Sequence, residues 1–415
     1  MNFLRGFSLN SASTLLVYGL GFLNHSLLSR HLKEDEYGDL AFWITTVMFG
    51  TLVLGEWLNR GNTYIVGRQG ARNQVFGNAL IYGLALLLPP ALAALIWWLG
   101  DRPAALIPAL LSAGLIVLTA LQKSALGIAL GEDRIKLYAL VPFVFILFYL
   151  GGNLFSAFDD SLNLHRVMVT WLLAMAASAL AALAALWRNS AGFAGADRAI
   201  FKKTARVGLR GALSYILIFL LFRSNVWIIE YLLDPTTLAT YRVVINFSDL
   251  IQHLPNVAGV VLLAKVVRGQ DESGELSLPV ARAALLFSLV STAAMALLGP
   301  YLIQLFFPKY TAAYPVLLYL LPGLICTSFG SIFNTKLGGL GYPSITLWAP
   351  ALALLLNLPL NWYLIPRMGL LGAALSNSLS YALWTLIITS HYLRRSNLSW
   401  ASFLLLPTHK PTIKK

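Results

Sequence analysis

The chain has 415 residues, of which 58% are hydrophobic and 11% are charged, and its mean hydropathy is +0.72. Soluble domains carry about 25% charged residues, so this composition excludes an ordinary soluble globule. The formal net charge of +13 would suggest nucleic acid as a partner of a soluble protein, but in a membrane protein it must first be assigned by topology. The single cysteine, Cys326, excludes an intrachain disulfide and any cysteine-based zinc or redox motif.

Apolar runs of about 20 residues predict twelve transmembrane helices. In chain order the predicted spans are 7–28, 39–58, 75–99, 104–126, 136–156, 166–187, 212–233, 240–263, 283–307, 314–335, 344–365 and 370–392. The first run is too long for the apolar region of a signal peptide and no small-residue cleavage site follows it, so we expect it to be retained. The sequence therefore predicts an all-α polytopic membrane protein.

Lys and Arg residues give the orientation, because cytoplasmic loops carry an excess of them. Of the 30 Lys and Arg residues, 20 lie on the side of the N-terminus and seven on the opposite side. Both termini are therefore expected in the cytoplasm. The remaining three basic residues lie inside or near the ends of spans, and they are Arg60, Lys123 and Arg223.

The spans divide into two groups of six. Residues 1–190 are expected to form an N-terminal six-helix lobe, 191–210 a basic cytoplasmic linker, 211–393 a C-terminal six-helix lobe and 394–415 a basic cytoplasmic tail. Segments 130–139 and 340–349 are identical at five of ten positions, at an offset equal to six spans. Six spans return the chain to its starting side, so the halves are expected to be parallel repeats. Tyr37 and Tyr241 form a weaker echo of this repeat.

Catalytic motifs are absent from the sequence. The six His residues show no metal-ligand spacing, and no nucleophile elbow or phosphate-binding glycine loop occurs. The glycines of 338–341 lie in a short turn between spans, where tight-turn geometry explains them. We therefore expect neither an enzyme nor a cofactor or metal site.

Arg223 lies near the midpoint of the seventh predicted span, too far from either end to reach the interface easily. An ionised side chain at the centre of a helix costs about 2.5 to 3.5 kcal/mol on insertion. Such residues therefore normally face a wet cavity or a partner. We expect Arg223 to line a functional cavity. The alternative is a buried structural ion pair, for example with Glu230.

A polar stripe follows the eighth predicted span with spacings of 4, 3, 4 and 3. This spacing places all five side chains on one helical face, which is expected to look onto water or other polar groups. Asp249 and His253 fall near the middle of the membrane and form an i, i+4 pair able to exchange a proton. The alternative is that the two only specify helix packing. The stripe consists of Arg242, Asn246, Asp249, His253 and Asn256.

Two further groups of polar residues lie within spans. Glu56 and Arg60 form an i, i+4 pair on the second span, and Lys123 lies on the fourth. Arg60 and Lys123 are near the cytoplasmic ends, so either contact with a substrate or snorkelling to the interface explains them. Asn357, Asn361, Asn377 and Tyr381, on the last two spans, are expected to hydrogen-bond between helices.

Several stretches carry a resemblance to a known family. Residues 28–38 hold a leucine, a polar run and then Tyr37-Gly38, and residues 59–68 hold an early glycine and a final arginine, with Asn59 where the family commonly has aspartate. Residues 231–235 lead to Tyr241, and Phe-Pro-Lys-Tyr follows at 307–310. The most specific stretch is 356–376. In these segments the chain resembles the oligosaccharide-lipid flippases of the O-antigen (Wzx-like) type, in the superfamily that includes the multidrug MATE exporters.

The resemblance implies two six-helix lobes around a central cationic cavity. The implied activity is transfer of a polyprenyl-diphosphate-linked oligosaccharide from the cytoplasmic to the periplasmic leaflet of a bacterial inner membrane, coupled to protons or sodium. The implied partners are this lipid, the coupling ion, the bilayer and other polysaccharide-assembly proteins, and nucleic acid is not among them. The candidate substrate-binding residues are Arg223, Arg60, Lys123 and Arg30, and the candidate ion-coupling residues are Asp249, His253 and Glu56.

Three other functions compete with this interpretation. A major-facilitator antiporter also has two parallel halves, but its loop motif after the second span requires an aspartate that 67–72 lacks. A MATE-type exporter of small molecules is closer to the resemblance, and the drug sensitivity of a deletion strain would separate it. A polysaccharide polymerase would need a sizeable periplasmic loop, and no predicted outward loop exceeds about ten residues.

Overall fold

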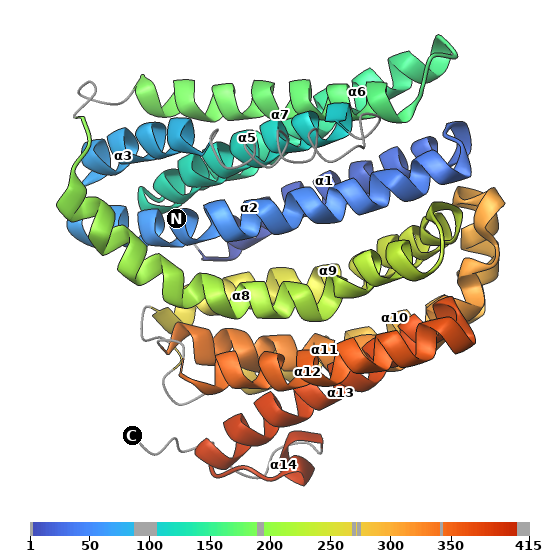
Figure 1. Ribbon diagram of the computed structural model, residues 1–415. Helices are drawn as coiled ribbons and strands as arrows, with labels where there is room; N and C mark the ends of the chain where they lie inside the picture. Colours follow the sequence, from blue (N-terminus) through green and yellow to red (C-terminus); the bar gives the residue numbers. More distant parts are fainter. Residues whose placement is uncertain are drawn as a thin grey trace. The chain divides into compact units, whose positions relative to one another are not determined.

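The computed structural model describes residues 3–86, 106–188, 195–267, 271, 275–340 and 343–404, and every regular element in these ranges is a helix (Figure 1). The helices are α1 (Phe3–His31), α2 (Glu34–Gln69), α3 (Arg72–Ala85), α5 (Leu106–Gly131), α6 (Ile135–Phe158), α7 (Leu164–Trp187), α8 (Arg198–Leu232), α9 (Pro235–Val267), α10 (Ser277–Phe306), the short 3₁₀ helix η2 (Pro308–Tyr310), α11 (Ala313–Gly339), α12 (Ile345–Met368), α13 (Leu370–Arg395) and α14 (Trp400–Leu404). The prediction of an all-α chain is confirmed.

Nine helices in the described ranges are long and apolar enough to cross a membrane. They are α2, α5, α6, α7, α8, α10, α11, α12 and α13, which coincide with nine of the twelve predicted spans. α1, α3 and α9 lie at the places of the other three. The remainder of the third predicted span, 87–99, lies outside the described residues.

The chain divides into two compact units, 1–216 and 217–415. In the first unit, α5 packs against α2, α3 and α7, and α6 packs against α1 and α7. In the second unit, α11 packs against α9, α10 and α13, and α12 packs against α13. Counting helices from the start of each unit, the pairings of unit 1 other than that of α6 with α1 recur in unit 2, in agreement with the predicted six-plus-six repeat. The boundary between the units falls inside α8.

Polar residues mark the points where two helices begin. Asn163 caps α7 by accepting a hydrogen bond from the Arg166 amide at 3.0 Å. The Asp234 carboxylate precedes α9 and accepts from the Thr237 amide at 2.8 Å, and the Thr236 and Thr237 hydroxyls donate to the same carboxylate. Hydrogen bonds from these hydroxyls hold the pKa of Asp234 below its ordinary value. Such caps satisfy amides that a helix leaves without intrahelical partners.

The basic segment that was expected to be a linker is partly helical, because α8 begins at Arg198. In unit 1 the first turns of α8 cross α2 closely at two glycines. A Cβ on Gly208 would stand 1.9 Å from the Trp57 carbonyl oxygen, and one on Gly61 would stand 2.4 Å from the Thr204 carbonyl oxygen. Only glycine allows backbones to approach so closely. Residues 191–194 of the expected linker lie outside the described range.

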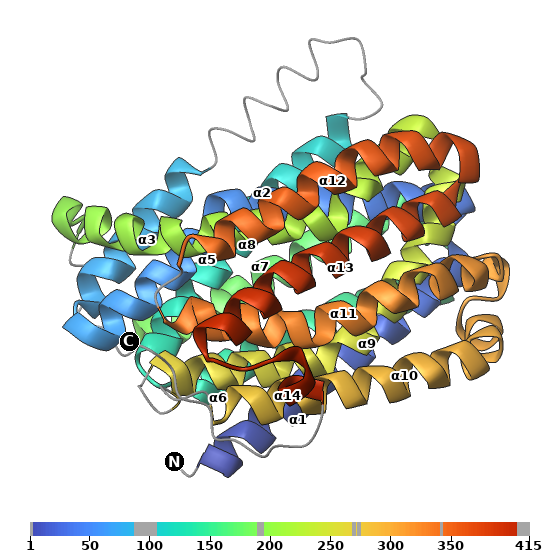
Figure 2. The ribbon, with the colours of Figure 1, turned by 90° about the horizontal axis from the view of Figure 1, so that it is seen from below.

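The C-terminal helix α14 lies back against unit 2 (Figure 2). Phe403 is fully buried, with its ring 5.4 Å from the rings of both Phe329 and Phe333 of α11. Arg282 of α10 donates hydrogen bonds to the carbonyls of Ser402 and Phe403. The first part of the predicted tail, up to Leu404, is therefore a docked element. The rest of the tail lies outside the described residues.

Candidate functional site

Glu56 joins two of the candidate cations in unit 1. Its carboxylate accepts from Arg60 Nε at 3.1 Å along α2 and from Lys123 Nζ of α5 at 3.2 Å. We name Glu56, Arg60 and Lys123 the unit 1 charge cluster. The predicted Glu56–Arg60 pair is therefore present, and the two cations share one carboxylate. The cluster carries a formal charge of +1.

Tyr215 adds an aromatic contact to the unit 1 charge cluster. The Arg60 guanidinium carbon lies 3.7 Å from the centre of the Tyr215 ring, which is a cation–π geometry. Tyr215 is in the part of α8 that belongs to unit 1. The sequence signalled the ions of the cluster by their places within spans, whereas no spacing rule linked Tyr215 to Arg60. This residue was missed by the prediction.

Arg30 does not belong to this cluster. It is exposed in the last turn of α1, two residues before the chain turns into α2. Arg60 lies 26 residues along α2 from its first residue, Glu34, which at 1.5 Å per residue corresponds to about 40 Å along the helix. The structure therefore separates Arg30 from Arg60, and a common binding site for the two is not supported.

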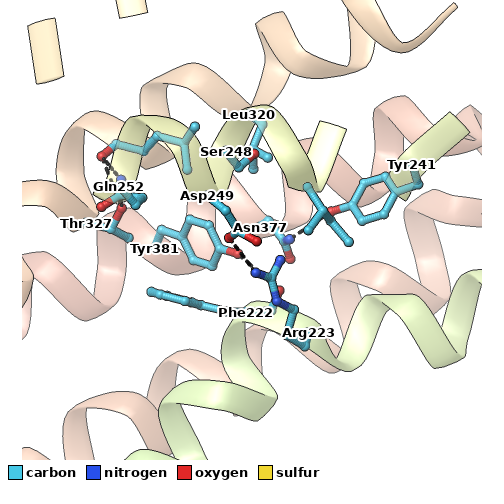
Figure 3. A pocket seen from close by; sticks show the side chains of 12 residues that line it. Phe222, Arg223, Tyr241, Ser248, Asp249, Gln252, Leu320, Thr327, Asn377 and Tyr381 are labelled. Atoms are coloured by element: carbon cyan, nitrogen blue, oxygen red, sulfur yellow. Dashed lines mark hydrogen bonds and ion pairs between the residues drawn. The ribbon is translucent and has the colours of Figure 1, made fainter. Parts of the chain in front are cut away.

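Arg223 and Asp249 form an ion pair in unit 2. Arg223 of α8 donates from Nη2 to Asp249 Oδ1 of α9 at 2.5 Å (Figure 3). The two side chains differ in accessibility, because 17% of the Arg223 side chain and 42% of the Asp249 side chain is exposed. Arg223 thus has a partner, but this partner is Asp249 and not the Glu230 considered from the sequence.

The ion pair lies in the wall of a pocket, which we name the unit 2 pocket. The cavity has a volume of about 30 Å³, enough for one or two water molecules. Tyr241 and Tyr381 flank the ion pair, and the Gln252 amide on another wall donates to Thr327 Oγ1 at 2.8 Å (Figure 3). The pocket is lined by Phe222, Arg223, Tyr241, Ile245, Ser248, Asp249, Gln252, Leu320, Leu324, Thr327, Asn377 and Tyr381.

A buried hydrogen-bond network extends from the unit 2 pocket. The Tyr241 hydroxyl accepts from the side-chain amides of Asn225 and Asn377, the latter at 3.1 Å. Asn377 in turn accepts from Asn357 at 3.0 Å, and the Asn357 oxygen accepts from Asn361 at 2.8 Å. The network joins α8, α9, α12 and α13. The asparagines of the last two spans therefore bond between helices, as expected, and hold Tyr241 in the pocket wall.

The polar stripe of α9 does not face a single environment. Arg242, Asn246 and His253 are buried, Asp249 is partly accessible and Asn256 is exposed. The proton-exchanging pair predicted from the spacing therefore has unequal members. The Asp249 carboxylate accepts a hydrogen bond from Arg223, while His253 lies in the interior one turn further along α9.

The site contains chemistry for binding an anion and for taking up a proton. Arg223 is a fixed cation with several donors, and Asp249 is a carboxylate that a small solute can reach. Among the residues that the structure describes, no three His, Cys, Asp or Glu side chains gather in a way that could hold a metal ion.

Comparison with known structures shows the fold. The chain superimposes with a TM-score of 0.75 on an inward-facing multidrug-resistance MATE family transporter of the MOP superfamily, at 17% identity over 93% of this chain and 98% of the other. The TM-score is also 0.75 for the lipid II flippase MurJ in an inward closed conformation, at 15% identity over 92% of this chain and 87% of that chain. A MOP superfamily transporter from Pyrococcus furiosus has a TM-score of 0.69 at 16% identity, over 94% of this chain and 95% of that one.

Sequence comparison does not identify a family for the chain. No protein-family profile matches the chain. An uncharacterised membrane protein of Methanocaldococcus jannaschii is 34% identical over 101 residues, which are 23% of this chain and 20% of that protein. The chain thus spans about a fifth of the length of this curated relative. The prediction of about twelve membrane helices in two lobes is confirmed by the fold shared with the transporters and the flippase.

Proposed function

We propose that this protein moves a polyprenyl-diphosphate-linked oligosaccharide from the cytoplasmic to the periplasmic leaflet of a bacterial inner membrane, coupled to an ion gradient. The observation that carries the proposal is the Arg223 guanidinium at the wall of the unit 2 pocket, within a membrane-spanning helix. A permanent cation at membrane depth is energetically costly, so such residues are rare and commonly mark the pathway of a substrate or an ion. A diphosphate is an anion that Arg binds well, through paired hydrogen bonds.

Three further observations support this function. The fold is shared with a lipid II flippase as well as with multidrug exporters. Unit 1 supplies a second cationic group, Arg60 and Lys123, within spans. The excess of Lys and Arg on the predicted cytoplasmic side favours collection of an anionic lipid head there. Asp249 and Glu56 are the carboxylates proposed to carry the coupling ion, and both termini are proposed to be cytoplasmic.

A MATE-type exporter of small molecules is the second candidate, because the TM-score to a multidrug transporter equals that to the flippase. An exporter of organic cations would bind its substrate with the Asp249 carboxylate. Arg223 would then compete with the substrate cation for that carboxylate. Loss of the gene should raise drug sensitivity under this alternative and leave surface glycan unchanged. The flippase proposal expects the opposite pair of results.

The direct test is Arg223→Ala in cells whose surface polysaccharide depends on this protein. Removing the guanidinium removes the proposed diphosphate contact, so we expect surface glycan to fall by about tenfold or more, as for loss of a charge-assisted contact of about 1.5 to 3 kcal/mol. Lipid-linked repeat units should accumulate at the same time. Glycan is measured on gels and protein level by immunoblot.

Arg367→Ala is the matched control for this experiment. Arg367 is also an arginine of unit 2, but it is exposed near the end of α12, where its guanidinium stacks 3.7 Å from the Tyr363 ring centre. This variant should keep its surface glycan. Normal glycan in Arg223→Ala at normal protein level would remove Arg223 from the mechanism and withdraw the main support for the proposed substrate.

A further inference from the structure

We propose that Asp249 and the substrate diphosphate compete for Arg223, so that protonation of Asp249 releases the guanidinium for the substrate. This inference rests on the proposed function and assigns the linkage between proton and substrate to one ion pair. The proton and the diphosphate then bind cooperatively at this ion pair. The ion pair present in the structure is the state that lacks both.

The geometry of the pocket makes the competition direct. Among the 12 lining residues Arg223 is the one cation and Asp249 the one anion. An anion that reaches the accessible side of this ion pair therefore has one guanidinium among the lining residues to bind, and that guanidinium already donates to Asp249 Oδ1 at 2.5 Å. The Arg223 side chain is mostly enclosed by the protein, whereas Asp249 is 42% exposed. The carboxylate is thus the accessible member of the pair, and it alone has a site for a proton, because the guanidinium is already protonated.

The other groups around Asp249 add no charge to the pocket besides that of Arg223. From α9 itself Tyr241 and His253 lie on either side along the helix, and from α13 Tyr381 faces the ion pair (Figure 3). The α11 wall contributes Leu320, Leu324 and Thr327, which carry no charge. Tyrosine has an ordinary pKa near 10, so between about pH 5 and 8 the hydroxyls stay protonated. His253 is not among the lining residues.

The direction of the linkage follows from charge. When Asp249 is ionised, a diphosphate that takes Arg223 leaves a carboxylate without its cation inside a membrane span, which is costly. When Asp249 is protonated, Arg223 is free and this cost disappears. Diphosphate affinity should therefore rise as the pH falls, and by reciprocity diphosphate binding should draw a proton onto Asp249.

The first test compares the wild type with Asp249→Asn, which imitates the protonated carboxyl. The full-length protein is placed in nanodiscs of neutral phosphatidylcholine, and the Kd for geranylgeranyl diphosphate is measured between pH 8 and pH 5.5. Wild-type binding should be weaker than that of Asp249→Asn at pH 8 by about five- to tenfold, within the usual range of coupling between sites. The two should converge at pH 5.5. The phosphate's own titration affects both proteins equally and cancels in the comparison.

Glu230→Gln is the matched control. Glu230 lies on α8 like Arg223, but it is not among the residues that line the unit 2 pocket. The substitution removes one carboxylate of the same unit, and the pH dependence of the Kd should remain that of the wild type. Geranylgeraniol, which lacks the diphosphate, controls for binding by the lipid tail.

A second measurement uses only the wild type and does not depend on the folding of a variant. Calorimetric titrations at pH 7.5 in buffers of different ionisation enthalpy count the protons taken up when geranylgeranyl diphosphate binds. The wild type should take up protons when the diphosphate binds, because the bound diphosphate favours the protonated form of Asp249. Equal pH dependence in the wild type and Asp249→Asn, or no proton uptake by the wild type, would overturn the inference.

The outcomes separate this inference from the proposed function. Binding of the diphosphate with identical pH profiles in the wild type and Asp249→Asn refutes the linkage and leaves the diphosphate as substrate. Failure of both proteins to bind it across the pH range, with no loss of surface glycan in Arg223→Ala, refutes both.

Discussion

Lys336 and Asp271 form a second ion pair in unit 2, and this one is closed to solvent. Lys336 Nζ of α11 lies 3.0 Å from Asp271 Oδ2, and both side chains are 0% exposed. Asp271 also accepts from the Leu276 amide at 2.8 Å and from the Ser277 hydroxyl. These bonds fix the segment before α10 to the end of α11. The pair contrasts with Arg223–Asp249, whose carboxylate is accessible, and is therefore assigned a structural role.

Lys336→Ala tests this structural role. The substitution leaves the Asp271 carboxylate buried without its cation, which typically costs about 3 to 5 kcal/mol. We expect a clear fall in the thermal unfolding midpoint of the protein in detergent, measured by intrinsic fluorescence. Lys202→Ala, at an exposed position of α8, should change the stability by less than about 0.5 kcal/mol. Equal midpoints for the two variants would contradict the assignment.

The comparison of Lys336 with Arg223 shows how far single residues can be predicted from sequence. Arg223 stood out because it lies in the middle of a span, where a charge requires a partner or a cavity. Lys336 lies at the end of a span, so the positive-inside rule explained it as a basic residue of a cytoplasmic loop. Its partner is 65 positions away and no spacing rule connects them. Position along a helix is readable from sequence, but burial by a distant loop is not.

At the level of the helices, the crossing of α2 and α8 in unit 1 depends on glycine. Gly208→Ala would place a Cβ within 1.9 Å of the Trp57 carbonyl oxygen. A backbone atom cannot move aside as a flexible side chain can, so the two helices must separate. We expect a loss of about 1 to 3 kcal/mol, the usual cost of overpacking, and a lower yield of monodisperse protein. Size-exclusion chromatography and thermal unfolding in detergent measure both effects.

Gly151→Ala provides the matched control for the helix crossing. Gly151 lies in the span α6, and a Cβ at this position meets no atom within 4 Å. The added methyl group should leave the yield unchanged, and replacing a helical glycine should if anything stabilise α6 slightly. A Gly208→Ala protein as stable as Gly151→Ala would show that α2 and α8 are not in close contact.

Across the whole chain, the repeat explains why the lobes were predictable although the sites were not. Tyr37 in the first turn of α2 and Tyr241 in the second turn of α9, which were paired from the sequence, are both buried. Asn153 of α6 donates to Asn24 of α1 at 2.9 Å, and Ser224 of α8 donates to Asn357 of α12 at 3.3 Å. The first and fifth helices of each unit are therefore joined by polar bonds.

The charged groups, in contrast, do not follow the repeat. Unit 1 places its carboxylate, Glu56, between two cations, whereas unit 2 pairs Asp249 with Arg223. Apolar periodicity and chain length were sufficient to predict the helices, because these depend on many residues. A site depends on a few side chains from helices distant in sequence, and only those at unusual depth in a span could be identified.

The orientation of the whole molecule gives the last prediction. The excess of Lys and Arg on the N-terminal side predicts that the start of α8 faces the cytoplasm, while the turns after α6 and α10 face the periplasm. Cys326 is the one cysteine in the chain, so Cys326→Ser provides a cysteine-free background. Into it we would introduce Lys202→Cys, Asp159→Cys and Lys309→Cys, which are exposed positions of the two units.

A membrane-impermeant maleimide applied to cells with a permeabilised outer membrane should label Asp159→Cys and Lys309→Cys but not Lys202→Cys. Lysis should expose Lys202→Cys to the same reagent, which controls for its reactivity. Because Asp159 and Lys309 lie in different units, their common labelling also tests whether the units have the same orientation, as parallel repeats require. Labelling of one without the other would indicate an inverted repeat. Labelling of Lys202→Cys in unlysed cells would place the start of α8 on the periplasmic side and contradict the direction of transport that we propose.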